Sequence, residues 1–229
     1  MKVQTRWHIL EDPLAVAEEA ARRVCEAARR AISERGVFRI VLAGGRTPQD
    51  MHMLLTRADT DWTRWRVYFG DERCLPVNDS ERNSEAARVA LFDKVSIPAQ
   101  GVHPIPAELG AEAAAAAYVP VVDAALPFDV VTLGMGEDGH TASLFPGRVY
   151  PTAEIVHAVH DSPKPPPGRV SLSAGALSCA REILILVTGA GKRDAVAAWR
   201  AGQALPVASI GGETVVDVLL DQDACGDLN

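Results

Sequence analysis

Apolar residues recur every three or four positions between residues 14 and 34, which predicts a helix with one apolar face. Val24, Ala28 and Ala31 share that face, and glutamate and arginine side chains lie opposite them. Gly36 is expected to end the helix, because glycine readily adopts the left-handed conformation found at helix ends.

Four short and almost continuously apolar runs follow, and this pattern is typical of strands that are buried on both faces of a sheet. Helical patterns separate these runs. The strands are predicted at 37–42, 67–69, 130–133 and 183–187, and the helices at 48–57, 81–93, 110–125 and 191–201. The repetition predicts an α/β fold with right-handed crossovers and a mostly parallel sheet. Binding residues are then expected on the loops at the carboxyl ends of the strands.

Residues 146–168 interrupt this alternation. A strand is predicted at 155–160, and the proline-rich run at 162–167 is expected to be extended and stiff. Sheet-like sequence resumes directly afterwards. We therefore interpret the segment as an irregular excursion within a single domain that spans residues 1–229.

Composition narrows the class of protein. With 229 residues, 48% of them hydrophobic, the chain can bury a core without disulfides or metals. A net charge of −7 argues against nucleic acid or an anionic membrane as a partner. The four cysteines form no CxxC pair, and neither a signal peptide nor a membrane-spanning run is apparent. A cytoplasmic protein with free thiols is expected.

The loop at 43–48 is a candidate anion site. Gly44 and Gly45 let the backbone approach a ligand closely, and Thr47 is expected to cap the next helix. Exposed N–H groups at that helix start, together with Arg46, would bind an anion. A simple glycine turn into a capped helix explains this loop equally well when it is taken alone.

A second candidate loop, with Asp71, Glu72 and Arg73, directly follows the strand predicted at 67–69. Such runs are most often solvated surface charges. Their position at the carboxyl end of a central strand favours a functional role.

The loop at 134–146 is the most informative. It contains GxGxxG after a strand, but Glu137 and Asp138 would repel a pyrophosphate, and the Phe-Pro-Gly at 145–147 ends the helix that a dinucleotide site needs. The loop instead offers His140, two residues from Asp138. Histidine titrates near neutral pH and suits a general base, and a nearby carboxylate can orient it.

Two further cations are candidates for binding phosphate. Lys192 ends the stretch TGAGK at 188–192, which is not a P-loop because the first glycine and the final serine or threonine are missing. Arg169 follows the proline run. Taken singly, each is better explained as a surface cation.

Other catalytic arrangements lack support in the sequence. His157 and His160 would point to opposite faces of a strand, so no metal site is expected there. No GxSxG motif is present, and no cysteine has an activating partner nearby.

Several ordered blocks resemble those of the 6-phosphogluconolactonases, a family related in fold to the glucosamine-6-phosphate isomerases (deaminases). The blocks are AGGRTP at 43–48, GDER at 70–73, GMGEDGHTASLFP at 134–146, PKPPPGRVSL at 163–172 and GAGKR at 189–193. The ending GHTASLFP is typical of the lactonase branch. Two departures are visible: Ala43 and Arg82 stand where many members have serine.

The resemblance implies an isomerase/CoA-transferase-like fold, a three-layer α/β/α sandwich around a mostly parallel sheet. It implies hydrolysis of 6-phospho-D-glucono-1,5-lactone to 6-phosphogluconate in the oxidative pentose phosphate pathway. It further implies a sugar-phosphate lactone as the only partner and no cofactor, and we expect a monomer.

The same resemblance assigns roles to individual residues. His140 would be the general base, Asp138 would orient it, and Arg73 would stabilise the oxyanion at the lactone carbonyl. The residues that would bind the phosphate or position the substrate are Gly44, Gly45, Arg46, Thr47, Asp71, Asn83, Arg169 and Lys192.

Two alternatives stay open from the residues alone. A sugar-phosphate isomerase on the same fold needs a carboxylate that moves a proton, and Glu72 or Asp71 would serve. A non-catalytic sugar-phosphate sensor would keep the phosphate-binding residues but not the His140–Asp138 pair.

Overall fold

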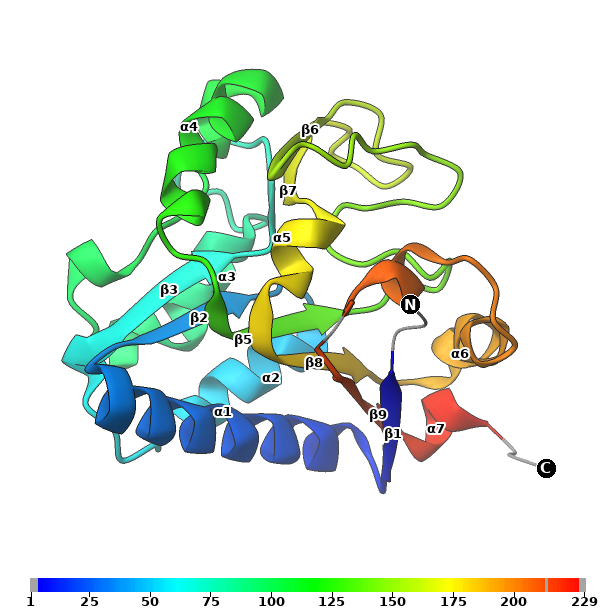
Figure 1. Cartoon of the computed structure of the whole chain (residues 1–229), viewed down its shortest axis with the longest axis horizontal. Coiled ribbons are helices and arrows are strands. Elements are labelled where there is room, and N and C mark those ends of the chain that lie inside the picture. The colour runs from blue at the N-terminus through cyan, green and yellow to red at the C-terminus, as the bar shows by residue number, and fades with distance from the viewer. Residues whose placement is uncertain (1–3, 213, 227–229) are drawn as a thin grey trace.

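The computed structural model describes residues 4–212 and 214–226. Six strands form one sheet in the order β1-β9-β8-β5-β2-β3, and every pairing within it is parallel (Figure 1). These strands are β1 (Thr5–Leu10), β2 (Phe38–Leu42), β3 (Trp65–Phe69), β5 (Phe128–Gly134), β8 (Ala180–Val187) and β9 (Val216–Asp221). The predicted parallel sheet is thus confirmed.

Helices cover both faces of the sheet. Figure 1 shows α1 and α2 along one side of the sheet and α5, with α4 beyond it, on the other. The helices are α1 (Pro13–Arg35), α2 (Arg46–Leu55), α3 (Asn83–Ala90), α4 (Ala111–Asp123), α5 (Ala174–Ser178), α6 (Arg193–Arg200) and α7 (Gln222–Cys225). The three-layer α/β/α arrangement is therefore as predicted.

Helix α1 illustrates how local sequence fixes an element. The carboxylate of Asp12 accepts the N–H of Ala15, Pro13 occupies the first turn, and Gly36 ends the helix with φ of 72°. The buried face is mostly alanine, so the helix packs closely against β1, β2, β5, β8 and β9. The prediction of a helix ended by Gly36 is confirmed.

A second, antiparallel sheet lies on the α5 side, with the order β4-β7-β6 (Figure 1). It consists of β4 (Asp71–Arg73), β7 (Arg169–Leu172) and β6 (Val156–Val159). The strand predicted at 155–160 is thereby confirmed. The interpretation of 71–73 as a loop is wrong, because its backbone pairs with β7, a partner about a hundred residues away that no local pattern reveals.

No helix within the described ranges 4–212 and 214–226 is long and apolar enough to cross a membrane.

The sheet order decides where chemistry can take place. Strands β8, β5, β2 and β3 are consecutive neighbours and run in the same direction. The loops after their carboxyl ends therefore meet at one edge of the sheet. These are the loops that carry the candidate motifs.

Candidate active site

A pocket of about 650 Å³ opens at this edge of the sheet. All the predicted site residues except Asp138 line it, namely Gly44, Gly45, Arg46, Thr47, Asp71, Arg73, Asn83, His140, Arg169 and Lys192. Six separate segments of the chain contribute them. The fold therefore brings together residues that are up to about 150 positions apart in the sequence.

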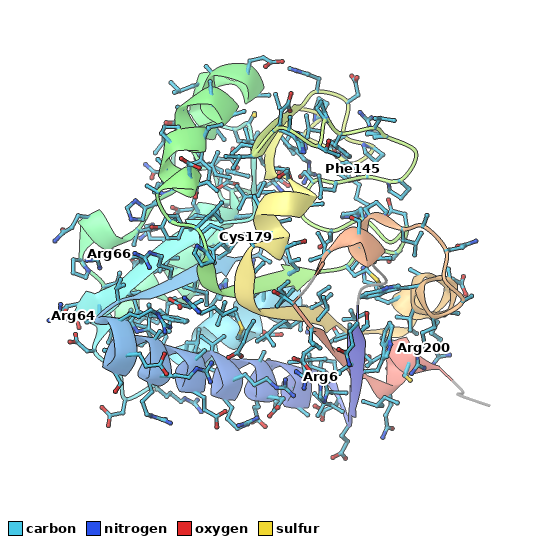
Figure 2. The ribbon with its side chains drawn as sticks, viewed as in Figure 1. Arg6, Arg64, Arg66, Phe145, Cys179 and Arg200 are labelled. Atoms are coloured by element: carbon cyan, nitrogen blue, oxygen red, sulfur yellow. The ribbon has the colours of Figure 1, made fainter. Side chains whose placement is uncertain are left out.

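His140 is held by the loop that contains it. Oδ1 of Asp138 lies 2.5 Å from Nδ1 of His140 and accepts its backbone N–H at 3.2 Å. With the Nδ1 proton donated to Asp138, Nε2 is left as the basic nitrogen. The ring also packs against Phe145, with centroids 4.9 Å apart. Figure 2 places Phe145 beside the long loops of the small sheet.

Two glycines make this loop conformation possible. A Cβ on Gly136 would lie 2.0 Å from Nδ1 of His140 and 2.5 Å from Oδ1 of Asp138. Gly139 has φ of 78° and packs against Leu205. The glycines of the GxGxxG sequence thus allow the His140–Asp138 pair to pack closely against the loop backbone. No helix lies between β5 and β6, so the helix that a dinucleotide site needs does not follow this sequence.

Asp71 and Asn83 form a second hydrogen-bonded group in the pocket lining. Oδ2 of Asp71 accepts the hydroxyl of Ser143 at 2.6 Å, and Oδ1 accepts Nδ2 of Asn83 at 3.0 Å. The Asn83 side chain also abuts Gly44, where an added Cβ would lie 1.9 Å from Oδ1 of Asn83. The first loop glycine is therefore needed for close packing against Asn83.

Arg73 and Arg169 face each other across the β4–β7 pair. Nη1 of Arg73 donates to the carbonyl of Glu81 at 2.7 Å, while its buried Nε has no hydrogen-bond partner among the described residues. Arg169 donates through Nε and Nη2 to carbonyls of the proline-rich segment, and its Nη1 lies 4.0 Å from Asp71. Each guanidinium keeps N–H groups that a ligand can use.

The start of α2 differs from its prediction. The helix begins at Arg46, Gly45 occupies the cap position with φ of 100°, and no side chain caps it. Thr47 is therefore not the cap. Its hydroxyl lies 2.6 Å from that of Thr188, which links the loop at 43–48, the first loop of the site, to the loop at 188–192. The first N–H groups of α2 have no partners within the helix and remain available to an anion.

Lysines complete the cationic lining. Lys192, at the start of α6, is partly buried, which lowers its pKa, and Glu137 opposes that effect. Lys164, from the proline-rich segment, also lines the pocket. Sequence reasoning named Arg169 after this stiff segment and missed Lys164 within it, although the same segment positions both.

Glu72 takes no part in the pocket lining. It is fully buried and accepts the backbone N–H groups of Arg73, Asn83 and Ser84. The two adjacent carboxylates Asp71 and Glu72 therefore face different surroundings. Glu72 is unsuited to the proton transfer that an isomerase would require of it.

The two other histidines singled out in the sequence lie apart from the pocket. His157 is buried and pairs with Glu154, whereas the exposed His160 pairs with Glu112. Within the described part of the chain, no group of three or more His, Cys, Asp or Glu side chains is placed to hold a metal ion.

The environment of His140 predicts the pH dependence of any reaction that needs its neutral form. Burial lowers the pKa of His140 below its ordinary value of 6.5, and the hydrogen bond that His140 donates to the Asp138 carboxylate opposes this shift. We expect kcat/KM to be constant above neutral pH and to fall with a midpoint below 6.5. Asp138→Asn removes the raising influence, so the midpoint should move to still lower pH. The two pH–rate profiles, corrected for spontaneous reaction, check this expectation.

A phosphate group on the substrate, which the resemblance implies, also ionises near pH 6, but it does so identically with the wild type and with Asp138→Asn. A difference between the two profiles therefore belongs to the protein. A midpoint that does not move in Asp138→Asn, or moves upward, would contradict the attribution of this pH dependence to His140.

Comparison with known proteins identifies relatives along nearly the whole chain. The family described as glucosamine-6-phosphate isomerases/6-phosphogluconolactonase matches residues 11–218. A 6-phosphogluconolactonase of Mycobacterium leprae is 39% identical over 235 residues, which cover 94% of this chain and 95% of the relative. One from Streptomyces coelicolor is 40% identical over 240 residues, covering 95% and 92%.

Solved structures agree with this. The 6-phosphogluconolactonase of Trypanosoma brucei superposes with a TM-score of 0.88 at 28% identity, covering 99% of this chain and 100% of that one. A monomeric glucosamine-6-phosphate deaminase, at 19% identity and a TM-score of 0.84, shares the fold alone. The chain therefore belongs to the glucosamine-6-phosphate isomerase/6-phosphogluconolactonase family.

Proposed function

We propose that the chain hydrolyses 6-phospho-D-glucono-1,5-lactone to 6-phosphogluconate, a reaction of the oxidative pentose phosphate pathway. Its relatives along almost the full length are 6-phosphogluconolactonases. The observation that carries the proposal is a single pocket that combines the Asp138-bound His140 with cations from several loops. This pocket suits an anionic substrate that reacts at one end and is bound at the other.

In this proposal, His140 activates the attacking water. Nε2 removes a proton as the water oxygen bonds to C1 of the lactone. Asp138 holds the ring and stabilises the imidazolium that forms. General-base catalysis of this kind contributes about 10²–10⁴-fold.

Arg73 stabilises the oxyanion that develops on the lactone carbonyl. The species that carries this oxyanion is a tetrahedral intermediate at C1. As it collapses, the bond between C1 and the ring oxygen breaks. The imidazolium of His140 returns its proton to that oxygen as it becomes a hydroxyl. The new carboxylic acid then ionises, so one proton is released for each lactone opened.

The phosphate end is bound away from the reacting carbon. The start of α2, with Gly45, Arg46 and Thr47, and the side chains of Lys192 and Arg169 supply donors and positive charge. Gly44, Asp71 and Asn83 position the substrate between the two ends. Binding energy from the phosphate thus holds the carbonyl against the water.

Release of protons tests the proposal. Enzyme is added to freshly prepared 6-phosphogluconolactone in weak buffer with EDTA, and unphosphorylated gluconolactone serves as the control. Rapid, phosphate-dependent acid release is expected. A rate equal to spontaneous opening would reject the lactonase, and an assay with glucosamine 6-phosphate would then test the isomerase. The monomeric state and cytoplasmic location stay predictions.

Lys192→Ala is expected to raise the KM for the phosphorylated lactone by roughly 10- to 100-fold, the usual effect of losing a charge-assisted hydrogen bond. The kcat should change much less, because in this proposal Lys192 binds the phosphate and not the reacting carbonyl. Steady-state kinetics measure both constants. The matched control is Lys94→Ala, which removes an exposed lysine outside the pocket. An unchanged KM in Lys192→Ala would remove this residue from the phosphate site.

A further inference from the structure

Glu72 is a fully buried carboxylate between two residues that line the pocket. Successive side chains of a strand point to opposite faces, so Asp71 and Arg73 face the pocket while Glu72 faces the interior. A buried charge is costly unless it is hydrogen-bonded and paired. The contacts of Glu72 meet both conditions.

The carboxylate binds three backbone N–H groups. Oε1 accepts those of Arg73 at 2.9 Å and Asn83 at 2.7 Å, and Oε2 accepts that of Ser84 at 2.9 Å. Asn83 and Ser84 are the first two residues of α3, whose N–H groups have no partners within the helix. An anion at this position is also favoured by the helix dipole. Glu72 therefore anchors the start of α3 to β4.

A buried arginine balances the charge. Nε of Arg82 lies 3.6 Å from Oε2 of Glu72, and Arg82 also donates to Glu108 and to the carbonyl of Ile105, each at 2.8 Å. Arg82 is a structural counter-ion that is 4% exposed.

The groups that Glu72 fixes reach the pocket from two directions. It holds the backbone of Arg73, whose guanidinium lines the pocket. It also holds Asn83, which hydrogen-bonds Asp71 and packs against Gly44 of the first loop. A shift of the Glu72 carboxylate would therefore displace Arg73 and the first loop together.

We propose that Glu72 is a positioning residue for the reaction: it sets Arg73 and Asn83 in their working geometry without touching the substrate. The proposal rests on the lactonase function proposed above. It differs from a purely structural role because it ties the substitution of Glu72 to turnover in molecules that remain folded.

Two substitutions test the charge and the length of the Glu72 side chain separately. Glu72→Gln keeps the shape but turns an N–H toward one of the three backbone amides. Glu72→Asp keeps the charge but shortens the side chain by one methylene, so the carboxylate no longer reaches both Arg73 and α3. Each should lower kcat/KM on 6-phosphogluconolactone by about 10- to 100-fold, as expected when catalytic groups shift by about 1 Å.

The matched control is Glu108→Gln, which removes the other, partly exposed carboxylate on Arg82 and leaves the three amide contacts intact. Its kcat/KM should stay near the wild-type value. All variants are assayed at a temperature where circular dichroism shows them folded. Because His140 is untouched, the midpoint of the fall in kcat/KM at low pH should be unchanged in the Glu72 variants. If Glu72→Gln does not fold, Glu72→Asp alone decides.

The activity of the wild type in the same assay separates a failure of the proposed lactonase function from a failure of the positioning role of Glu72. Its absence overturns the proposed function and this inference with it. With an active wild type, a folded Glu72→Asp or Glu72→Gln enzyme with wild-type kcat/KM overturns the positioning role alone. An equal loss in Glu108→Gln also overturns it, because the effect would then come from the ion pair with Arg82.

Discussion

His140→Ala is expected to lower kcat on 6-phosphogluconolactone by about 10²–10⁴-fold, the contribution that a general base typically makes. His140 lines the pocket, and the carboxylate of Asp138 fixes one nitrogen of its ring and leaves the other as the basic nitrogen. The proposed phosphate site is formed by other loops, so the KM should change little. Background-corrected steady-state kinetics give both constants.

His160→Ala is the matched control, because His160 is exposed and pairs with Glu112 outside the pocket. Its kcat should equal that of the wild type. Product binding by calorimetry shows whether the pocket of His140→Ala is intact. Near-normal turnover by a folded His140→Ala enzyme would refute the proposed mechanism.

Gly136→Ala should lower kcat by about 10²-fold or more, although it adds only one methyl group. That carbon would lie 2.0 Å from Nδ1 of His140, far closer than atoms can approach. Either the histidine leaves Asp138 or the loop backbone moves, and both changes misplace the base. Displacements of about 1 Å are enough to cost this much rate. Kinetics at a temperature where the variant is folded measure the effect.

A glycine near the site whose substitution is tolerated provides the control. At Gly70, an added Cβ would meet Val41, Leu133 and Leu177 at 3.6–3.8 Å, which is ordinary contact. Gly70→Ala should therefore retain most of the activity. Equal turnover in the two glycine variants would mean that close packing of His140 does not matter.

The central architecture could be predicted from the sequence because its signals are local. Continuous apolar runs revealed strands β2, β3, β5 and β8, and the alanine-rich stripe with Gly36 revealed α1. Strands β1 and β9 were not predicted. Their buried polar residue Asp217 is satisfied by His8 and Arg6, which lie more than two hundred residues away. No local sequence pattern predicts contacts between residues so far apart.

In the candidate site, too, features with a local signal could be predicted, and features that depend on distant contacts could not. Loops at strand ends could be named, because parallel strands deliver them to one edge. The different roles of Asp71 and Glu72 could not be derived from the residues alone, since only the pairing of β4 with β7 shows which carboxylate faces the pocket. The contact of Thr47 with Thr188 likewise depends on two loops meeting in space.

The most direct test of the account compares kcat/KM for 6-phosphogluconolactone and unphosphorylated gluconolactone in the wild type, His140→Ala and Lys192→Ala. If base and phosphate site are separate groups around one pocket, His140→Ala lowers both values by the same factor and keeps their ratio. Lys192→Ala then lowers only the value for the phosphorylated lactone, and the ratio falls. A His140→Ala enzyme that loses activity on the phosphorylated lactone alone would contradict the account.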